Sequence, residues 1–319
     1  LTFEMMKRGL EIDEEVEGRL GEVVREAEVV LQKHLDSLAG SPIDVNSAPQ
    51  VHALLYGRLG LPKQHNRGGK RDEDGHLPVS AGEDAITTLM IKEEAGSEVH
   101  QILEGILLVR RARKLLSSYI GLEREGGVVR YTITPLATET FRFTSGKSAF
   151  GLGANMQTIP KPMRAMFPAP PGRLILQPDL SQAEARIVAY ASRCKRMKDL
   201  FNDPTRSIHL EQGKIVYGRD VDKGTYEYTV VKSSRHASNY REGPTRFSQQ
   251  TRLPLSEAKR ILAADRRLHP EIDRWHRWVK EEVTKRGFLT TTFGHRRQFF
   301  EAVCHASFRG KITDQQWKD

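Results

Sequence analysis

The spacing of apolar residues predicts that the chain begins with long helices. Asp13 is a favourable N-cap, and apolar residues then recur at helical spacing from Val16 to Leu38 until Gly40 ends the run. Asn46-Ser47-Ala48-Pro49 predicts the start of a second helix, because proline is favoured in a first turn. Helical spacing resumes from about residue 82 to residue 122. The first third of the sequence is therefore predicted to be helical.

The pattern changes after Gly126-Gly127, where strands are expected. Residues 128–134 are rich in β-branched side chains, which favours a strand. The apolar run Arg173–Asp179 ends at an acid and predicts a second strand, and residues 182–192 then return to helical spacing. From His209 to about Arg286 the pattern is again mainly helical. The predicted order is helical, then mixed with strands, then helical.

The composition favours a cytoplasmic protein that binds a polyanion. With 50 Lys and Arg against 41 Asp and Glu, the net charge is +9 and the pI is near 9.5. A positive charge favours nucleic acid, because neutralising phosphates releases counterions. No signal peptide is apparent, and no apolar run approaches the roughly 18 residues of a membrane span. Cys194 and Cys304 form neither a disulfide framework nor a zinc-binding pattern, which is typical of a reducing compartment.

The segment that begins Asp179-Leu-Ser-Gln-Ala-Glu184 carries the clearest chemistry. An aspartate between a buried strand and a helix presents its carboxylate at a sheet edge. A hard divalent cation can be held there together with waters and substrate phosphates. The alternative is that Asp179 only caps the following helix, which is the better interpretation of an isolated aspartate.

Two other segments are suited to contact with nucleic acid. Between residues 138 and 164 lie side chains that can donate hydrogen bonds to sugars, phosphates and minor-groove acceptors: Arg142, Asn155, Gln157 and Arg164. The polar stretch 63–75 predicts a solvated loop. Its functional alternative is a basic tip that follows a phosphate backbone through Lys63, Arg67, Lys70 and Arg71.

The segments Thr138–Ser145, Asn155–Pro160 and Asp179–Tyr190 resemble, in their order and short spacing, motifs of family-A DNA polymerases. The resemblance extends over nearly the whole chain. It implies an α+β fold with the right-hand polymerase architecture, in which a helical thumb and helical fingers flank an incomplete antiparallel β palm. The implied domains are a thumb at 1–122, the first part of the palm at 123–205, and fingers at 206–319.

The resemblance further implies template-directed DNA synthesis, with primer-template DNA and dNTP as partners and a two-metal Mg²⁺ centre. Asp179 is implied to be the catalytic residue and metal ligand, and Glu184 to close off the sugar 2′ position. The other implied nucleotide-binding residues are Gln182, Lys232, Arg235, His236 and Tyr240. Arg296 and Arg297, in a segment similar to the exit from the fingers, are added to the implied DNA-binding residues.

The implied nucleotide helix departs from the family pattern. Lys232, His236 and Tyr240 keep a four-residue spacing, which places them on one helix face where a cation can meet a triphosphate and an aromatic ring can stack on a base. His236 stands where the family usually has Lys, and Arg241 stands where Gly is usual. Arg235 is a candidate to take over the phosphate contact. The alternative is a basic amphipathic helix without this role. With a Tyr at position 240, the chain resembles family members that accept chain terminators lacking the 3′ hydroxyl.

One expected carboxylate is missing from the sequence. Family members supply it from a His-Asp-Glu motif, and no His-Asp pair follows Asp179. We favour a split polymerase, in which a second polypeptide carries the C-terminal palm, over a truncated or decayed gene product. Neither version predicts robust catalysis by this chain alone, because phosphoryl transfer of this kind uses two metals.

Two other functions fit the sequence less well. The first is a non-catalytic primer-template DNA-binding protein derived from a polymerase. The second is a relative of single-subunit RNA polymerases, against which Glu184 and the segment 155–160 argue. His269 and His276 are expected to pack around Trp275 and Trp278 rather than to bind metal, and Cys194 is expected to be a buried small side chain.

Overall fold

The computed structural model describes residues 2–66, 71, 75–148, 150–177 and 179–299. The chain divides into two compact units, Leu1–Gln177 and Pro178–Asp319. The boundary between them falls inside the segment 123–205 that the sequence predicts to be palm. The division into thumb, palm and fingers therefore stays a prediction. Among the described residues, no helix has the length and apolar character needed to cross a membrane.

The first unit contains the predicted long helices. They are α1 (Thr2–Arg8), α2 (Glu14–Ala39), α3 (Ala48–His52), the π-helical turn Ala53–Arg58, α4 (Glu83–Met90) and α5 (Glu98–Tyr119). Asp13 caps α2, since its Oδ1 accepts a hydrogen bond from the backbone N–H of Val16 at 3.0 Å. Gly40 ends α2 with a φ of 64°, a conformation that glycine adopts without strain. Both predicted boundaries of this helix are confirmed.

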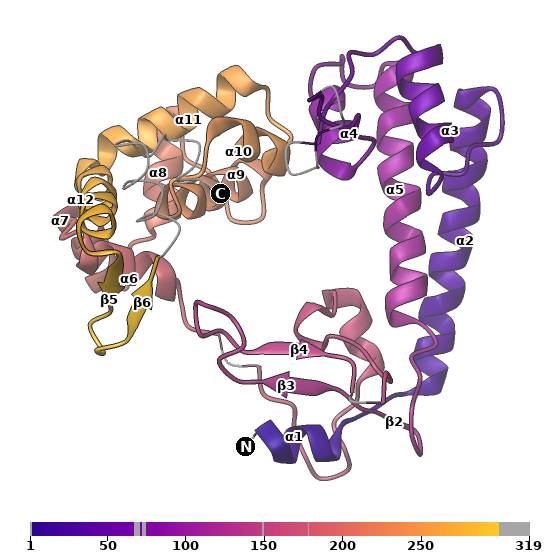
Figure 1. Cartoon of the computed structure of the whole chain (residues 1–319), viewed down its shortest axis with the longest axis horizontal. Coiled ribbons are helices and arrows are strands. Elements are labelled where there is room, and N and C mark those ends of the chain that lie inside the picture. The colour runs from indigo at the N-terminus through magenta and orange to yellow at the C-terminus, as the bar shows by residue number, and fades with distance from the viewer. Residues whose placement is uncertain (1, 67–70, 72–74, 149, 178, 300–319) are drawn as a thin grey trace. The chain divides into compact units, whose positions relative to one another are not determined.

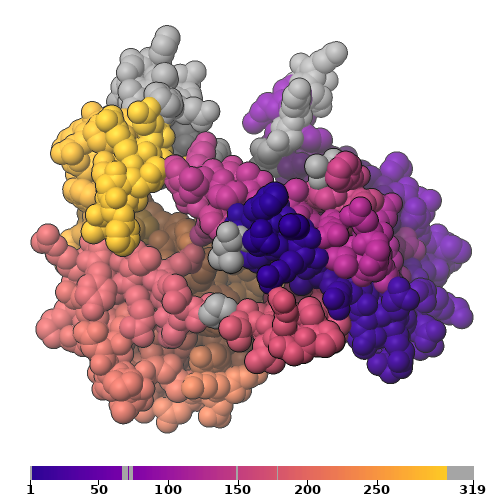
Figure 2. Space-filling model, turned by 90° about the horizontal axis from the view of Figure 1, so that it is seen from below, coloured from indigo at the N-terminus to yellow at the C-terminus, as the bar shows by residue number. Residues whose placement is uncertain are grey.

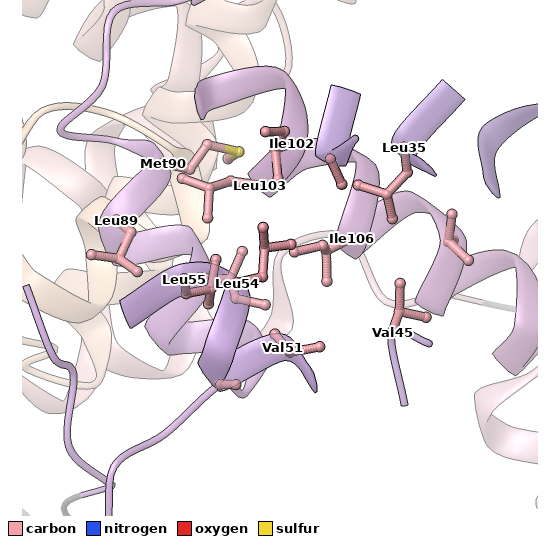
Figure 3. Packing of buried hydrophobic residues seen from close by; sticks show 14 residues of the cluster. Leu35, Val45, Val51, Leu54, Leu55, Leu89, Met90, Ile102, Leu103 and Ile106 are labelled. Carbon is pink, nitrogen blue, oxygen red and sulfur yellow. The ribbon is translucent and has the colours of Figure 1, made fainter. Parts of the chain in front are cut away.

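Helices α2 and α5 lie side by side over most of their length (Figure 1). The core that they share with the turn Ala53–Arg58 is apolar and includes Leu35, Leu55 and Ile106, which are fully buried (Figure 3). Gly105 permits the close approach of α5 to α2, because a Cβ at this position would lie 3.3 Å from Leu35 Cδ1. Burial of one such aliphatic side chain contributes about 1.5–3 kcal/mol to folding.

Two small antiparallel sheets follow in the same unit. Strand β1 (Leu10–Glu11) pairs with β2 (Val128–Val129), and β3 (Thr132–Thr134) pairs with β4 (Thr144–Gly146). The predicted strand 128–134 is therefore divided between two sheets. At the division the chain passes close to Gly153, where a Cβ would meet the carbonyl oxygen of Arg130 at 1.7 Å. The 3₁₀ turns Met156–Thr158 and Lys161–Met166 complete the described elements of this unit.

The predicted strand at 173–179 is wrong. Residues 173–177 form no strand, and Leu174 and Leu176 are 85% and 82% exposed. A strand needs a neighbour to accept and donate its backbone hydrogen bonds. None of the strands in the described part of the chain pairs with this segment. Its apolar composition therefore does not lead to burial here.

The second unit is mainly helical, as predicted. Its elements are α6 (Ala183–Ala191), α7 (Lys195–Asn202), α8 (Ile208–Tyr217), α9 (Tyr226–Asn239), α10 (Pro244–Thr251), α11 (Leu255–Leu268), α12 (Pro270–Arg286) and the antiparallel pair β5 (Phe288–Thr290) and β6 (Arg296–Gln298). One apolar cluster joins α6, α7 and α12, and a second joins α8 to α11. The end of the described chain, drawn in yellow, lies on the surface in Figure 2.

Candidate nucleotide and nucleic-acid sites

Helix α9 is buried on every side except one. Lys232, His236 and Tyr240 are exposed, whereas the intervening positions are mostly buried. Thr225 is the N-cap of the helix, and its hydroxyl accepts a hydrogen bond from the backbone N–H of Tyr228 at 3.2 Å. The predicted placement of the three side chains on one face is confirmed. We call this face the α9 stripe.

The α9 stripe lies next to α6. His236 Nε2 is 3.6 Å from Glu184 Oε2, and the rings of His236 and Tyr240 have centroids 4.9 Å apart. Glu184 and His236 are both about half exposed or more, so their ion pair contributes little to stability. The structure thus brings together a carboxylate, an imidazole and a phenol from two helices, all accessible to a ligand.

Arg235 is placed differently from the prediction. It is 1% exposed, and its Nη1 donates a hydrogen bond to Oδ1 of the equally buried Asp265 at 2.9 Å. Burial lowers the pKa of Arg235 and raises the pKa of Asp265, and the attraction between the two groups opposes both shifts. A guanidinium held in this way is turned away from the α9 stripe. The structure therefore does not support a phosphate contact by Arg235.

Asp179 is exposed, and it does not cap helix α6. The N-cap of α6 is Gln182, three residues later, with a φ of 54°. The alternative role of Asp179 as a helix cap is thus excluded. Among the residues that the structure describes, no group of three or more His, Cys, Asp or Glu side chains could hold a metal ion. Asp179 presents one exposed carboxylate. The absence of a second metal-binding carboxylate from this sequence stays a prediction.

The predicted minor-groove residues lie around β4 in the first unit. Asn155 Oδ1 accepts a hydrogen bond from the backbone N–H of Gln157 at 3.0 Å, and Gln157 Nε2 donates to the carbonyl of Phe143 at 3.2 Å. Arg142 is exposed, and its backbone N–H donates to Thr138 Oγ1 at 2.9 Å. These bonds bring the segments 138–145 and 155–158 together, as one shared surface requires.

The other predicted DNA contacts are dispersed. Arg164 donates to the carbonyl of Ile159 at 3.2 Å and to Gln177 Oε1 at 3.3 Å. Lys63 and Arg71 are exposed, whereas Arg67 and Lys70 lie outside the described residues. On β6 the Arg296 guanidinium lies 3.5 Å from the centre of the Phe288 ring, and Arg297 is half-buried.

Two buried histidines and a cysteine surround the Arg235–Asp265 pair. Burial lowers the pKa of His209 to about 4 and that of His269 to about 3, and the charge of Arg235 acts in the same direction. Cys194 is fully buried, as predicted, with its Sγ 3.5 Å from His269 Nδ1. Burial raises the pKa of the Cys194 thiol. These three side chains are buried and are therefore not accessible to a ligand on the surface.

Sequence reasoning missed the role of Asp265, although a signal was present. Ala258, Ile261 and Leu262 form the buried stripe of α11, and Asp265 occupies the next position of that stripe. A charged residue in the register of a core is buried only when it is paired. The same argument applies to Arg235, which follows Val230 and Val231 on the buried side of α9.

Comparisons with known proteins identify the family of the chain. The family model described as DNA polymerase family A matches residues 14–312. The thermostable DNA polymerase I of Thermus aquaticus is 28% identical over 281 residues, which is 84% of this chain and 31% of that protein. DNA polymerase I of Helicobacter pylori is 27% identical over 309 residues, which is 92% of this chain and 31% of that protein. The chain thus spans about a third of the length of these relatives.

A solved structure shows the same fold. The polymerase domain of Pol1 from M. smegmatis, solved in complex with DNA primer-template and dNTP, matches with a TM-score of 0.74 at 22% identity. The match covers 99% of this chain and 53% of that one. The predicted α+β class and right-hand polymerase architecture are therefore confirmed.

Proposed function

The chain belongs to DNA polymerase family A, and on that premise we propose that it takes part in template-directed DNA synthesis. The reaction is the addition of a deoxynucleotide to the 3′ end of a primer paired to a template. The observation that carries the proposal is the α9 stripe, which exposes Lys232, His236 and Tyr240 next to Glu184. The rest of α9 is used for packing, so this face is what the helix presents to a ligand.

The stripe has the chemistry that a nucleoside triphosphate requires. Lys232 supplies a fixed positive charge for the triphosphate, and the Tyr240 ring supplies a surface on which a base can stack. We assign Glu184 to the exclusion of a sugar 2′ hydroxyl. We assign His236, whose Nε2 is 3.6 Å from Glu184 Oε2, to the same nucleotide contact. Gln182, at the strained start of α6, is assigned to the same nucleotide contact. Arg235 is not part of this set, because it is buried.

Asp179 is the residue that we assign to Mg²⁺. The ion accepts one or two protein carboxylates together with waters and substrate phosphates, so one exposed aspartate fits a part of such a site. The bound metal would supply charge neutralisation during phosphoryl transfer. We propose that the second carboxylate belongs to polypeptide outside these 319 residues, on a second chain that carries the remaining palm. The exposed apolar segment at Leu174–Leu176 supports this proposal, because it has the composition of a strand that still needs a neighbour.

The first unit carries the groups that we assign to primer-template DNA. Its minor-groove set comprises Arg142, Asn155, Gln157 and Arg164, and its phosphate-contacting set comprises Lys63, Arg67, Lys70 and Arg71. Arg296 and Arg297 add two positive charges in the second unit. A net charge of +9 supports a nucleic-acid partner. We assign residues 1–122 to a thumb, 123–205 to the first part of a palm and 206–319 to fingers.

Primer extension with Mg²⁺ and dNTPs tests the proposal. The chain is assayed alone and with a polypeptide that carries the rest of a family-A palm, and DNA affinity is measured in parallel. We expect extension only with the second chain. Asp179→Asn should abolish extension, and the control Asp199→Asn, at another acid of the second unit, should not. Extension by this chain alone would refute the assignment of the second carboxylate to another polypeptide.

The missing acid also favours a second candidate function, a DNA-binding protein derived from a polymerase. Retained primer-template affinity without extension under either condition would support it. Loss of both properties would contradict the two proposals together.

A further inference from the structure

One carboxylate oxygen joins three helices at the centre of the second unit. Asp265 Oδ1 on α11 accepts a hydrogen bond from Arg235 Nη1 on α9 at 2.9 Å and from Gln212 Nε2 on α8 at 2.6 Å. Gln212 Nε2 also lies 3.1 Å from Ser234 Oγ, the residue before Arg235 on α9. All four side chains are buried. The contact therefore links α9 to both helices that lie behind it.

The position of Arg235 on α9 relates this contact to the α9 stripe. Each residue advances about 100° around an α-helix. Arg235 thus lies about 100° from His236 around the axis, and Ser234 about 200°. The two anchored side chains occupy the side of α9 that faces the core, while the α9 stripe occupies the side that faces solvent. Any rotation of α9 would move both sets together.

A buried ion pair restricts rotation more sharply than apolar packing does. Apolar faces can repack with small changes in angle, because dispersion contacts have little directionality. A guanidinium that leaves its carboxylate inside a core is left charged and without a partner, which carries a large penalty. Burying both charges also has a desolvation penalty, so stability alone is a weak explanation for the pair. Fixing one orientation is an effect that such a pair can provide.

We propose that the Arg235–Asp265 pair, with Gln212, sets the rotation of α9 and thereby directs Lys232, His236 and Tyr240 toward the ligand. Arg235 is then a positioning residue that acts through the helix and touches no substrate. The proposal deepens the proposed function and rests on it for the identity of the ligand. The rotation itself is independent of any nucleotide and can be measured without one.

Thiol labelling measures the rotation directly. Cysteine is introduced at exposed position 236 (His236→Cys) or at buried position 237 (Ala237→Cys), and labelling rates are read peptide by peptide, so that Cys194 and Cys304 are counted separately. With the pair intact, position 236 should react at least about tenfold faster than position 237. In the Arg235→Met/Asp265→Leu background, the ratio of the two rates should fall toward one.

The matched control removes an exposed ion pair of the same unit. Lys195 and Asp199 lie on one face of α7, and Lys195 Nζ is 2.6 Å from Asp199 Oδ2. Lys195→Met/Asp199→Leu should leave the labelling ratio unchanged. Helix content and the unfolding midpoint of each variant are measured alongside. An apolar pair of similar volume is expected to keep the unit folded.

A conservative variant covers the case in which the double variant does not fold. Arg235→Lys keeps the charge but loses the planar fork of the guanidinium, so α9 should stay folded with a labelling ratio between those of the intact and apolar backgrounds. A ratio equal to that of the intact chain, in a folded double variant or in Arg235→Lys, would overturn the proposal.

Nucleotide affinity provides the second measurement. In the presence of primer-template, the dNTP dissociation constant of the Arg235→Met/Asp265→Leu variant should rise about tenfold, which corresponds to a loss of about 1.4 kcal/mol of binding free energy. A purely structural role would predict wild-type affinity once folding is restored. If the unsubstituted chain binds no dNTP, the proposed function fails. The labelling ratio would then decide the positioning proposal by itself.

Discussion

Two cores of the molecule differ in kind, one around α2 and α5 in the first unit and one around α9 in the second. Around α2 and α5 the core is apolar, and Leu35, Leu55 and Ile106 are held by shape and by exclusion of water. Around α9 the core contains a buried ion pair, Arg235 with Asp265, and a buried glutamine that binds the same carboxylate. The apolar core around α2 and α5 stabilises the two long helices. The second kind lies directly behind the surface that we assign to the nucleotide.

The difference shows what each kind of core provides. Apolar packing contributes stability and tolerates substitutions that conserve volume. A buried ion pair contributes little net stability but penalises every arrangement in which the partners separate. A helix that must present three side chains in one direction gains more from the second property. Trp275 and Trp278 lie on α12 of the second unit, and residues 1–177 contain no tryptophan, so tryptophan fluorescence reports unfolding of the second unit separately.

The largest expected effect is that of Arg235→Met alone. Removing the guanidinium leaves Asp265 buried and unpaired, and such changes destabilise by about 3–5 kcal/mol. Tryptophan fluorescence during urea unfolding should show a lower midpoint for the second unit. Adding Asp265→Leu should recover most of the loss. If the single variant unfolded like the unsubstituted chain, the pair could not be an electrostatic unit.

Mild acid should distinguish the same two cores. His209 and His269 are buried, and their folded pKa values of about 4 and about 3 lie below the ordinary value for histidine. Between those values and about pH 6.5 the unfolded state binds more protons, so stability is lost as the pH falls. Burial is the main cause, followed by Lys232 and Arg235 for His209, and by Arg235 and Arg196 for His269.

The expected size of the acid effect follows from the two shifts. From pH 7 to pH 5, each histidine should cost the second unit about 2 kcal/mol of unfolding free energy. Tryptophan-detected urea unfolding at a series of pH values measures the slope. His209→Gln should remove about 2 kcal/mol of the loss between pH 7 and pH 5. If His209→Gln left the pH dependence of the unfolding free energy unchanged, the lowered pKa of His209 would not be a cause of the acid effect.

Leu35→Ala tests the apolar core of the first unit. Loss of a fully buried leucine should destabilise that unit by about 3 kcal/mol, within the usual range for such cavities. In urea unfolding, the transition followed by circular dichroism should begin at a lower urea concentration than in the unsubstituted chain. The midpoint of the transition followed by tryptophan fluorescence should not change. An equal shift in both signals would mean that the two units unfold as one.

The sequence predicted the first unit better than the site, for physical reasons. The capped helix from Asp13 to Gly40 depends on local interactions, and its boundaries were therefore predictable. The α9 stripe was predictable because it follows the helical period. The burial of Arg235 was not predictable, because it depends on Asp265, which lies 30 residues later and on another helix. The segment 173–177 failed as a strand for a similar reason, since a strand depends on its neighbour.

A smaller effect is expected on the exposed side of α9. A lysine carries a permanent positive charge that attracts a triphosphate. His236→Lys should therefore strengthen dNTP binding by about 1 kcal/mol, close to a fivefold change in affinity. Lys232→Gln in the same assay should weaken binding. If the unsubstituted chain and His236→Lys bound dNTP with equal affinity, position 236 would not contact the phosphates.

The smallest predicted effect concerns the end of α9, where Arg241 occupies a position that favours glycine. Arg241 has a φ of 54°, and the backbone N–H of Glu242 donates to the carbonyl of Ala237 at 2.7 Å, which is the bonding pattern of a helix that ends in a left-handed residue. A side chain in this conformation is disfavoured by about 1–2 kcal/mol, and glycine avoids that strain but has more freedom to lose on folding. Arg241→Gly should therefore raise the unfolding free energy of the second unit by only about 0.5 kcal/mol. Tryptophan-detected unfolding can resolve this change, with Arg246→Gly inside α10 as a destabilising control. A loss of stability in Arg241→Gly would mean that the arginine side chain stabilises the helix end by more than its backbone strain.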